Sequence, residues 1–193
     1  MGLLTSAIEA ELDGEYRRAI RSYSQLAKQG SMLDRVGIYQ AIARCLEKLG
    51  SLRKAGYWHE EAGQGYLKLP SRLMGPQERA YYAMVEFRSA IQDYAHTPSM
   101  RSAAYSYLKA LEICLKAGKE GYSHEMLFAA SLCAEIHAFK KAAEFFAETA
   151  AEFEKEKQRG LARESYLLGG RYYEKSGNAR LARELRAAAR ALR

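Results

Sequence analysis

The sequence predicts an all-α protein, an α-α superhelix (a right-handed solenoid) of about five antiparallel helix pairs. The 193 residues include only three prolines, and stretches between turn signals carry apolar residues at helical spacing. A short pattern of a small residue, a turn, then alanine and an aromatic residue at set offsets returns along the chain. Because one copy is too short to bury its own apolar face, the copies must stack on their neighbours.

Turn signals divide the chain into ten expected helices. Asp13-Gly14 and Gly50-Ser51 punctuate the first two pairs, and Ser31 is suited to cap the third helix, with Asp34 as a capping-box acid in its first turn. The expected helices are 2–13, 15–29, 32–49, 51–68, 76–95, 98–118, 123–136, 138–157, 159–176 and 178–192.

Small residues recur at the same offset from each turn. Side chains of this size let two helix backbones approach closely, so we expect these positions to lie at helix contacts. The alanines found five residues after the turns are Ala19, Ala55, Ala103, Ala142 and Ala182.

The chain is long enough, at 48% apolar residues, to fold as one repeat domain over 1–193 without disulfides. Its three cysteines, Cys45, Cys114 and Cys133, lie in apolar helical stretches and are expected to be reduced packing residues. The longest candidate loop is 69–76, which ends in a proline suited to the first position of a helix. We expect this loop to be a hinge.

Two pairs show the repeat register most clearly. The positions are Gly14, Tyr16, Ala19 and Tyr23 in the first pair, and Tyr166, Gly169, Gly170, Tyr173, Gly177 and Ala182 in the fifth. This register resembles that of the tetratricopeptide-repeat (TPR)-like superfamily. The turn-to-turn spacings of 36, 48, 39 and 40 residues exceed that family's usual period of about 34, and in this respect the chain is more similar to the soluble NSF-attachment protein (SNAP) branch. The resemblance implies stacked helix pairs and an adaptor function.

The sequence contains no motif for catalysis, for a cofactor or for a metal ion. The four histidines, His59, His96, His124 and His137, never occur at the spacing of paired metal ligands on one helix. The mid-helix pair Gly169-Gly170 is better explained by close helix packing than by a phosphate loop. We therefore expect a protein that is not an enzyme and that uses no cofactor.

In helical-repeat arrays the first helix of each pair lines the concave groove, and basic residues recur at those positions here. Such a groove suits a protein or peptide partner with acidic groups. The alternative is an exposed polar face without a partner. The groove residues predicted from the register are Arg44, Lys48, Arg88, Gln92, Arg171 and Lys175.

The net charge of +7 is concentrated at the C-terminal end. The last expected helix carries Arg180, Arg183, Arg186 and Arg190, followed by Arg193. This basic helix either caps the array or makes the protein a nucleic-acid-associated regulator, which is the alternative function. With no apolar run long enough for a transmembrane segment, we expect a cytoplasmic protein.

Overall fold

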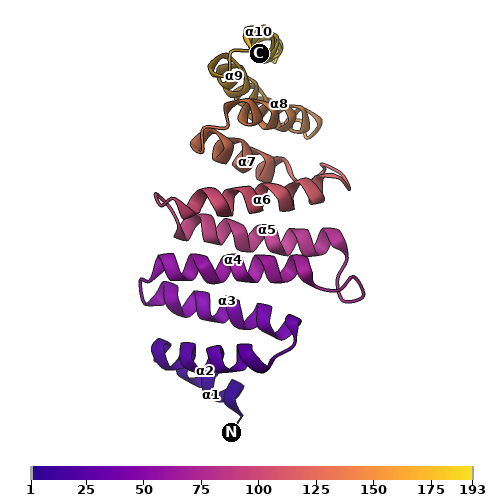
Figure 1. Ribbon diagram of the computed structural model, residues 1–193. Helices are drawn as coiled ribbons and strands as arrows, with labels where there is room; N and C mark the ends of the chain where they lie inside the picture. The colour runs from indigo at the N-terminus through magenta and orange to yellow at the C-terminus, as the bar shows by residue number, and fades with distance from the viewer. Residues whose placement is uncertain (1, 193) are drawn as a thin grey trace. The chain divides into compact units, whose positions relative to one another are not determined.

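The computed structural model describes residues 2–192, and this part of the chain is all-helical, with no strand (Figure 1). Every helix boundary lies within three residues of the one expected from the sequence, so the prediction of an all-α fold is confirmed. The helices are α1 (Leu3–Leu12), α2 (Tyr16–Gln29), α3 (Met32–Lys48), α4 (Leu52–Lys68), α5 (Pro76–Asp93), α6 (Ser99–Leu115), α7 (Ser123–Glu135), α8 (Phe139–Lys155), α9 (Arg159–Lys175) and α10 (Ala179–Ala191).

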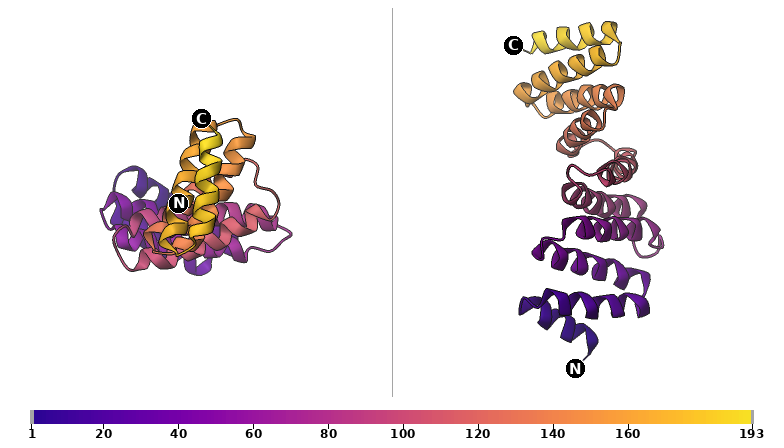
Figure 2. Two further views of the ribbon diagram at one scale, coloured as in Figure 1. Left: turned by 90° about the horizontal axis from the view of Figure 1, so that it is seen from above. Right: turned by 60° about the vertical axis from the view of Figure 1, so that its left-hand side comes forward.

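The chain divides into two compact units at the end of α6. The N-terminal unit extends to Cys114, and the C-terminal unit begins at Leu115. Within each unit, successive helices lie side by side (Figure 2). The 69–76 loop lies inside the N-terminal unit, where the α4 and α5 helices that it joins pack against each other. Motion at this loop stays a prediction.

Two helix starts follow the sequence signals closely. The Asp34 N–H donates to Ser31 Oγ (3.3 Å), and the Ser31 N–H donates to Asp34 Oδ2 (3.0 Å), which together form a capping box at the start of α3. These bonds to Ser31 lower the pKa of the Asp34 carboxyl. Pro76 is the first residue of α5, as expected.

Several helices end through the same left-handed turn. Gly14, Gly50 and Gly177 have φ of 75°, 69° and 82°, and in each case the following N–H donates to a carbonyl five residues back, at 2.8 Å. This bond satisfies a carbonyl that the helix itself leaves unpaired. In the C-terminal unit His137 and Lys157 occupy equivalent turns, each at φ 62°. Only glycine adopts this conformation without a steric cost.

The predicted small-residue register lies at helix contacts. The alanines that follow each turn by five residues, Ala19, Ala55, Ala103, Ala142 and Ala182, are all buried. A Cβ at Gly169 would lie 2.8 Å from Leu185 Cδ1, and one at Gly170 would lie 3.1 Å from the Ala182 carbonyl oxygen. The mid-helix glycine pair therefore allows α9 to pack closely on α10, as the sequence predicted.

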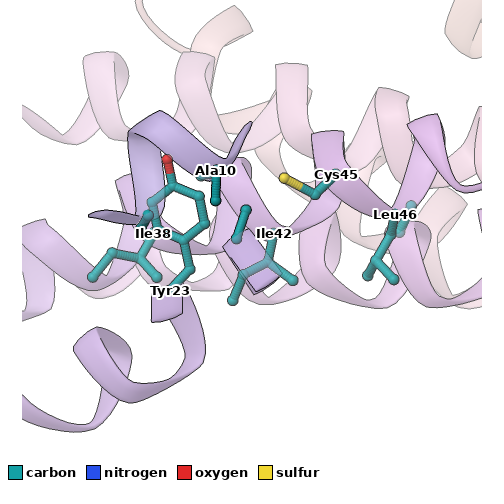
Figure 3. Close-up of a cluster of buried hydrophobic side chains, with 10 residues drawn as sticks. Ala10, Tyr23, Ile38, Ile42, Cys45 and Leu46 are labelled. Carbon is teal, nitrogen blue, oxygen red and sulfur yellow. The ribbon is translucent and has the colours of Figure 1, made fainter. Parts of the chain in front are cut away.

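The first three helices share an apolar core. Figure 3 shows the Tyr23 ring beside Ala10 and Ile38, with Ile42 and Leu46 further along α3. None of the helices in the described chain is long and apolar enough to cross a membrane.

Candidate functional site

A groove of about 760 Å³ lies between α1, α2 and α3. Its outer wall is an apolar ridge on α1, formed by Leu4, Ile8 and Leu12, whose exposed fractions are 52%, 44% and 81%. Tyr23 and Leu26 from α2, with Ile38 and Ala41 from α3, continue the apolar lining.

The spacing of apolar residues on α1 produces this exposed ridge. Leu4, Ile8 and Leu12 repeat every four residues and therefore share one face of the helix. Ala7 and Ala10 are buried in the core with α2. Gly37 lies in the groove on α3, and a Cβ there would meet nothing within 4 Å. The groove thus has room for side chains from a partner.

The groove contains one polar cluster. Glu11 accepts a hydrogen bond from the Tyr23 hydroxyl (2.7 Å) and another from Arg44 Nε (3.2 Å). Burial, together with the Glu11 carboxylate, raises the pKa of Tyr23 above its usual value. Burial also raises the pKa of the neighbouring Cys45 thiol to about 11. Arg44 keeps 55% of its side chain exposed, so its guanidinium can also reach a partner.

Of the residues predicted to line a groove, Arg44 is the one that lines the α1–α3 groove. Lys48 is exposed at the end of α3, and Gln92 is exposed near the end of α5. Arg88 is half-buried on α5. The third turn of the register is marked by Pro98, the first residue of the expected helix 98–118. Arg88 precedes Pro98 by ten residues, whereas Arg44 precedes Gly50, the second turn, by six. Arg88 therefore does not share the offset of Arg44.

The two predicted groove residues of the C-terminal unit lie on α9. Arg171 is exposed. Lys175 places Nζ 5.3 Å from the centres of both the Phe139 and the Tyr172 rings. At these distances the ammonium group is attracted to the ring faces by cation–π interactions. Lys175 is therefore already engaged within its own chain.

The basic α10 helix is partly neutralised by its own neighbours. Arg180 Nη1 lies 3.0 Å from Glu184 Oε1, and Arg186 forms an ion pair with Glu174 of α9. Arg183 and Arg190 are exposed, and Arg193 lies outside the described residues. The helix presents less uncompensated positive charge than its sequence alone suggests.

The structure also brings together a buried polar cluster that the sequence did not predict. His59 on α4 places Nδ1 2.8 Å from Glu86 Oε2 on α5, and Nε2 3.0 Å from Glu47 Oε1 on α3. Asp93 Oδ2, also on α5, lies 4.0 Å from the same Nε2. His59 has no second ligand at metal-site spacing on its own helix. Its partners lie 12, 27 and 34 residues away.

The charges within this cluster alter one another's protonation. Burial lowers the pKa of His59, but the hydrogen bonds and negative charges of Glu86 and Glu47 outweigh it, so the net shift is upward. Burial raises the pKa of Asp93 to about 6, against the opposing effect of the His59 charge.

Stacked helices, left-handed turns and a buried-alanine register define an all-α helical-repeat fold. The structure is similar to that of BtubC (BKLC) from P. vanneervenii, with a TM-score of 0.55 and 16% identity, covering 96% of this chain and 76% of that one. It is also similar to the MamA protein, with a TM-score of 0.51 and 15% identity, covering 98% of this chain and 89% of that one. At such identities the likeness shows the fold alone. No family model and no curated protein matches the sequence.

Proposed function

We propose that this chain is a non-catalytic protein-interaction scaffold that binds an amphipathic helix of another protein in the α1–α3 groove. The observation that carries the proposal is the exposed apolar ridge of Leu4, Ile8 and Leu12 beside an open groove. Contiguous exposed apolar surface of this kind is typical of interaction sites. A helix laid into an apolar groove is a recurring mode of recognition.

The shape of the ridge favours a helix as the occupant. Deeper in the same unit, α3 packs on α4 and α4 packs on α5, whereas the ridge on α1 is uncovered in the described chain. Its four-residue repeat is the ridge spacing that interlocks with the grooves of another helix. A partner helix with apolar residues at positions i, i+4 and i+7 would cover the ridge.

Arg44 and Lys48 favour acidic residues at the edge of that partner helix. Exposed ion pairs contribute only about 0.2–1 kcal/mol each. The apolar anchors must therefore supply most of the affinity, while the charges accelerate association.

The proposal is tested by selecting peptides from a displayed library of amphipathic helices against the full chain. We expect the selected peptides to lose binding to Leu12→Asp, which places a carboxylate on the ridge without removing a core contact. Leu73→Asp, at a position 54% exposed in the α4–α5 connection, is the matched control and should bind normally. Equal binding by both variants would contradict the groove.

Charge reversal separates the groove from the other predicted residues. Arg44→Glu should slow association and reduce its salt sensitivity, whereas Arg171→Glu on α9 should have no effect. If Arg171→Glu alone weakens binding, the binding surface lies in the C-terminal unit. If Leu12→Asp converts a self-associated form into monomers in sedimentation, the occupant is a second copy of this chain.

The same proposal includes two finer expectations, a cytoplasmic location and a relationship to the SNAP branch. All three cysteines are buried thiols, which supports a reducing compartment such as the cytoplasm. The 17-residue length of α3, α4, α6, α8 and α9 supports a relationship to the SNAP branch. Because two of the arginines of α10 are already paired with carboxylates, we favour the groove over binding of nucleic acid.

A further inference from the structure

We propose that Glu47, His59 and Asp93 form a binding site for a divalent transition-metal ion, with Zn²⁺ as its representative. The site lies in the N-terminal unit on α3, α4 and α5, and it is independent of the proposed groove.

The three side chains converge closely enough to share one ion. One donor atom from each lies within 4.8 Å of the others, and the distances from His59 Nε2 are 3.0 Å to Glu47 and 4.0 Å to Asp93. Zinc bonds of about 2.1 Å in a tetrahedral arrangement place neighbouring donors roughly 3.4 Å apart. Shifts of roughly 1 Å in the two carboxylates would therefore complete three of the four positions.

The environment of His59 prepares Nε2 as a ligand. Nδ1–H donates to Glu86 Oε2 (2.8 Å), and Glu86 in turn accepts a bond from Gln40 Nε2 (2.7 Å) through its other oxygen. A carboxylate behind the imidazole holds the ring in place, an arrangement found around most metal-bound histidines. The ion would displace the proton through which Nε2 bonds to Glu47 (3.0 Å). Glu86 is itself buried, so this support is rigid.

The Asp93 carboxylate provides independent evidence that a cation binds here. Its side chain is only 8% exposed, and its Oδ2 atom has no hydrogen-bond partner among the described residues. Burying a carboxylate oxygen without a partner is costly. This oxygen faces His59 Nε2, where a bound cation would compensate it.

Two glycines on α4 explain why α5 comes so close to His59. Gly56 and Gly63 lie on either side of His59, three residues before it and four after it, and so on the same face. A Cβ at Gly56 would lie 2.8 Å from the Tyr94 ring and 3.1 Å from Asp93 Cβ. A Cβ at Gly63 would lie 2.7 Å from the Phe87 ring. The absence of side chains at both positions lets α5 bring Glu86 and Asp93 to His59.

The donor set indicates the class of ion. One imidazole nitrogen with two carboxylate oxygens suits Zn²⁺, Co²⁺ or Mn²⁺, whereas Ca²⁺ requires six to eight oxygens and Cu⁺ prefers sulfur. The Glu47 side chain is 39% exposed, which leaves a route for the ion and a fourth position for water. Bound there, the ion would hold α3, α4 and α5 together.

The test is calorimetric titration of ZnCl₂ into the chelator-treated full chain, with CoCl₂ as a spectroscopic probe. We expect saturable binding of one ion per chain, a melting temperature raised by several degrees, and the strong visible absorption of four-coordinate Co²⁺. Asp93→Asn preserves the side-chain volume and should abolish the Co²⁺ bands. Glu86→Gln, which changes only the support of the imidazole, should weaken binding by about 10–100-fold.

Matched controls separate this site from weak surface binding. Glu60 is the neighbour of His59 in sequence but accepts its bond from the Tyr94 hydroxyl (3.0 Å), so Glu60→Gln should bind Zn²⁺ as the wild type does. Glu47→Gln alters a partly exposed ligand without disturbing the core, and it should lose binding even if Asp93→Asn proves unstable. The proposal is overturned if the wild type shows no saturable binding, or if Glu47→Gln and Asp93→Asn bind like Glu60→Gln.

Discussion

The two units use the same helix register but fill their interiors differently. In the N-terminal unit, His59 bonds to Glu86 and Glu47, so buried polar groups join three helices. In the C-terminal unit, the Phe146 ring stacks on Tyr172 of α9 at 5.5 Å.

Two buried polar residues of the C-terminal unit, Thr149 and Glu152, find partners on their own helix. Thr149 Oγ1 donates to the Phe145 carbonyl at 2.7 Å, and Lys155 donates to Glu152 at 2.8 Å. The register thus determines where helices approach, whereas the residues between the register positions decide whether that approach produces an apolar stack or a charged cluster.

The largest loss of stability is expected when one ring of the aromatic stack in the C-terminal unit is removed. Phe146→Ala should destabilise by about 3–5 kcal/mol, because a ring that is 2% exposed leaves a cavity between α8 and α9. Urea unfolding, with hydrogen exchange of the α8 and α9 amides, measures it. Leu167→Ala, at a position 40% exposed on α9, is the control and should cost much less. Equal losses would mean that the stack contributes no more than surface contacts.

The second prediction compares how much a buried polar group contributes to stability in each unit. In the metal-free protein Glu86→Ala should cost about 2–4 kcal/mol, since His59 and Gln40 both lose a buried partner. Thr149→Val should change stability by less than about 1 kcal/mol, because the hydroxyl bonds only to a carbonyl of its own helix. Thermal and denaturant unfolding of both variants would measure the difference. A larger loss from Thr149→Val would reverse the comparison.

The third prediction concerns the register that both units share. Ala142→Leu and Ala182→Leu in the C-terminal unit should each destabilise by about 1–3 kcal/mol, because the added methylenes would force apart a close helix contact. Ala55→Leu should do the same in the N-terminal unit, since this alanine is also completely buried. Melting temperatures measure the effect. Unchanged values in all three variants would show that these alanines do not lie at tight contacts.

The sequence predicted these alanines, and the helices around them, because turns and small residues are local signals. It did not predict the cluster at His59, because Glu47, Glu86 and Asp93 reach it from other helices, at separations that no short motif spans. The sequence did contain one signal of this cluster. Gly56 and Gly63 lie on the same face of α4 as His59, and this spacing indicates a close helix contact around a titratable group.

The apolar ridge of the groove was not predicted, for a different physical reason. The register predicted Arg44 as a groove residue on the first helix of a pair, and in the structure Arg44 lines the α1–α3 groove. Binding of a partner by Arg44 stays a prediction. Leu4, Ile8 and Leu12, however, have the spacing of core residues, and an amphipathic pattern does not reveal whether its apolar face is covered within the same chain. Only the structure shows that this face is exposed.

The smallest expected effect comes from the turns, where residues of different types share a left-handed conformation. Lys157 lies at φ 62° after α8, whereas Gly50 lies at φ 69° after α3. Lys157→Gly should stabilise by about 0.5–1 kcal/mol, because the relief of left-handed strain exceeds the added entropy of the unfolded chain. Gly50→Ala should destabilise by a similar amount. His137→Gly should gain less than Lys157→Gly, since it also removes a ring contact with Phe139 (5.6 Å between centres). The midpoints of urea unfolding of the three variants measure these differences. If Lys157→Gly is less stable than the wild type, the prediction is wrong. The lysine side chain would then stabilise the end of α8 by more than its backbone strain costs.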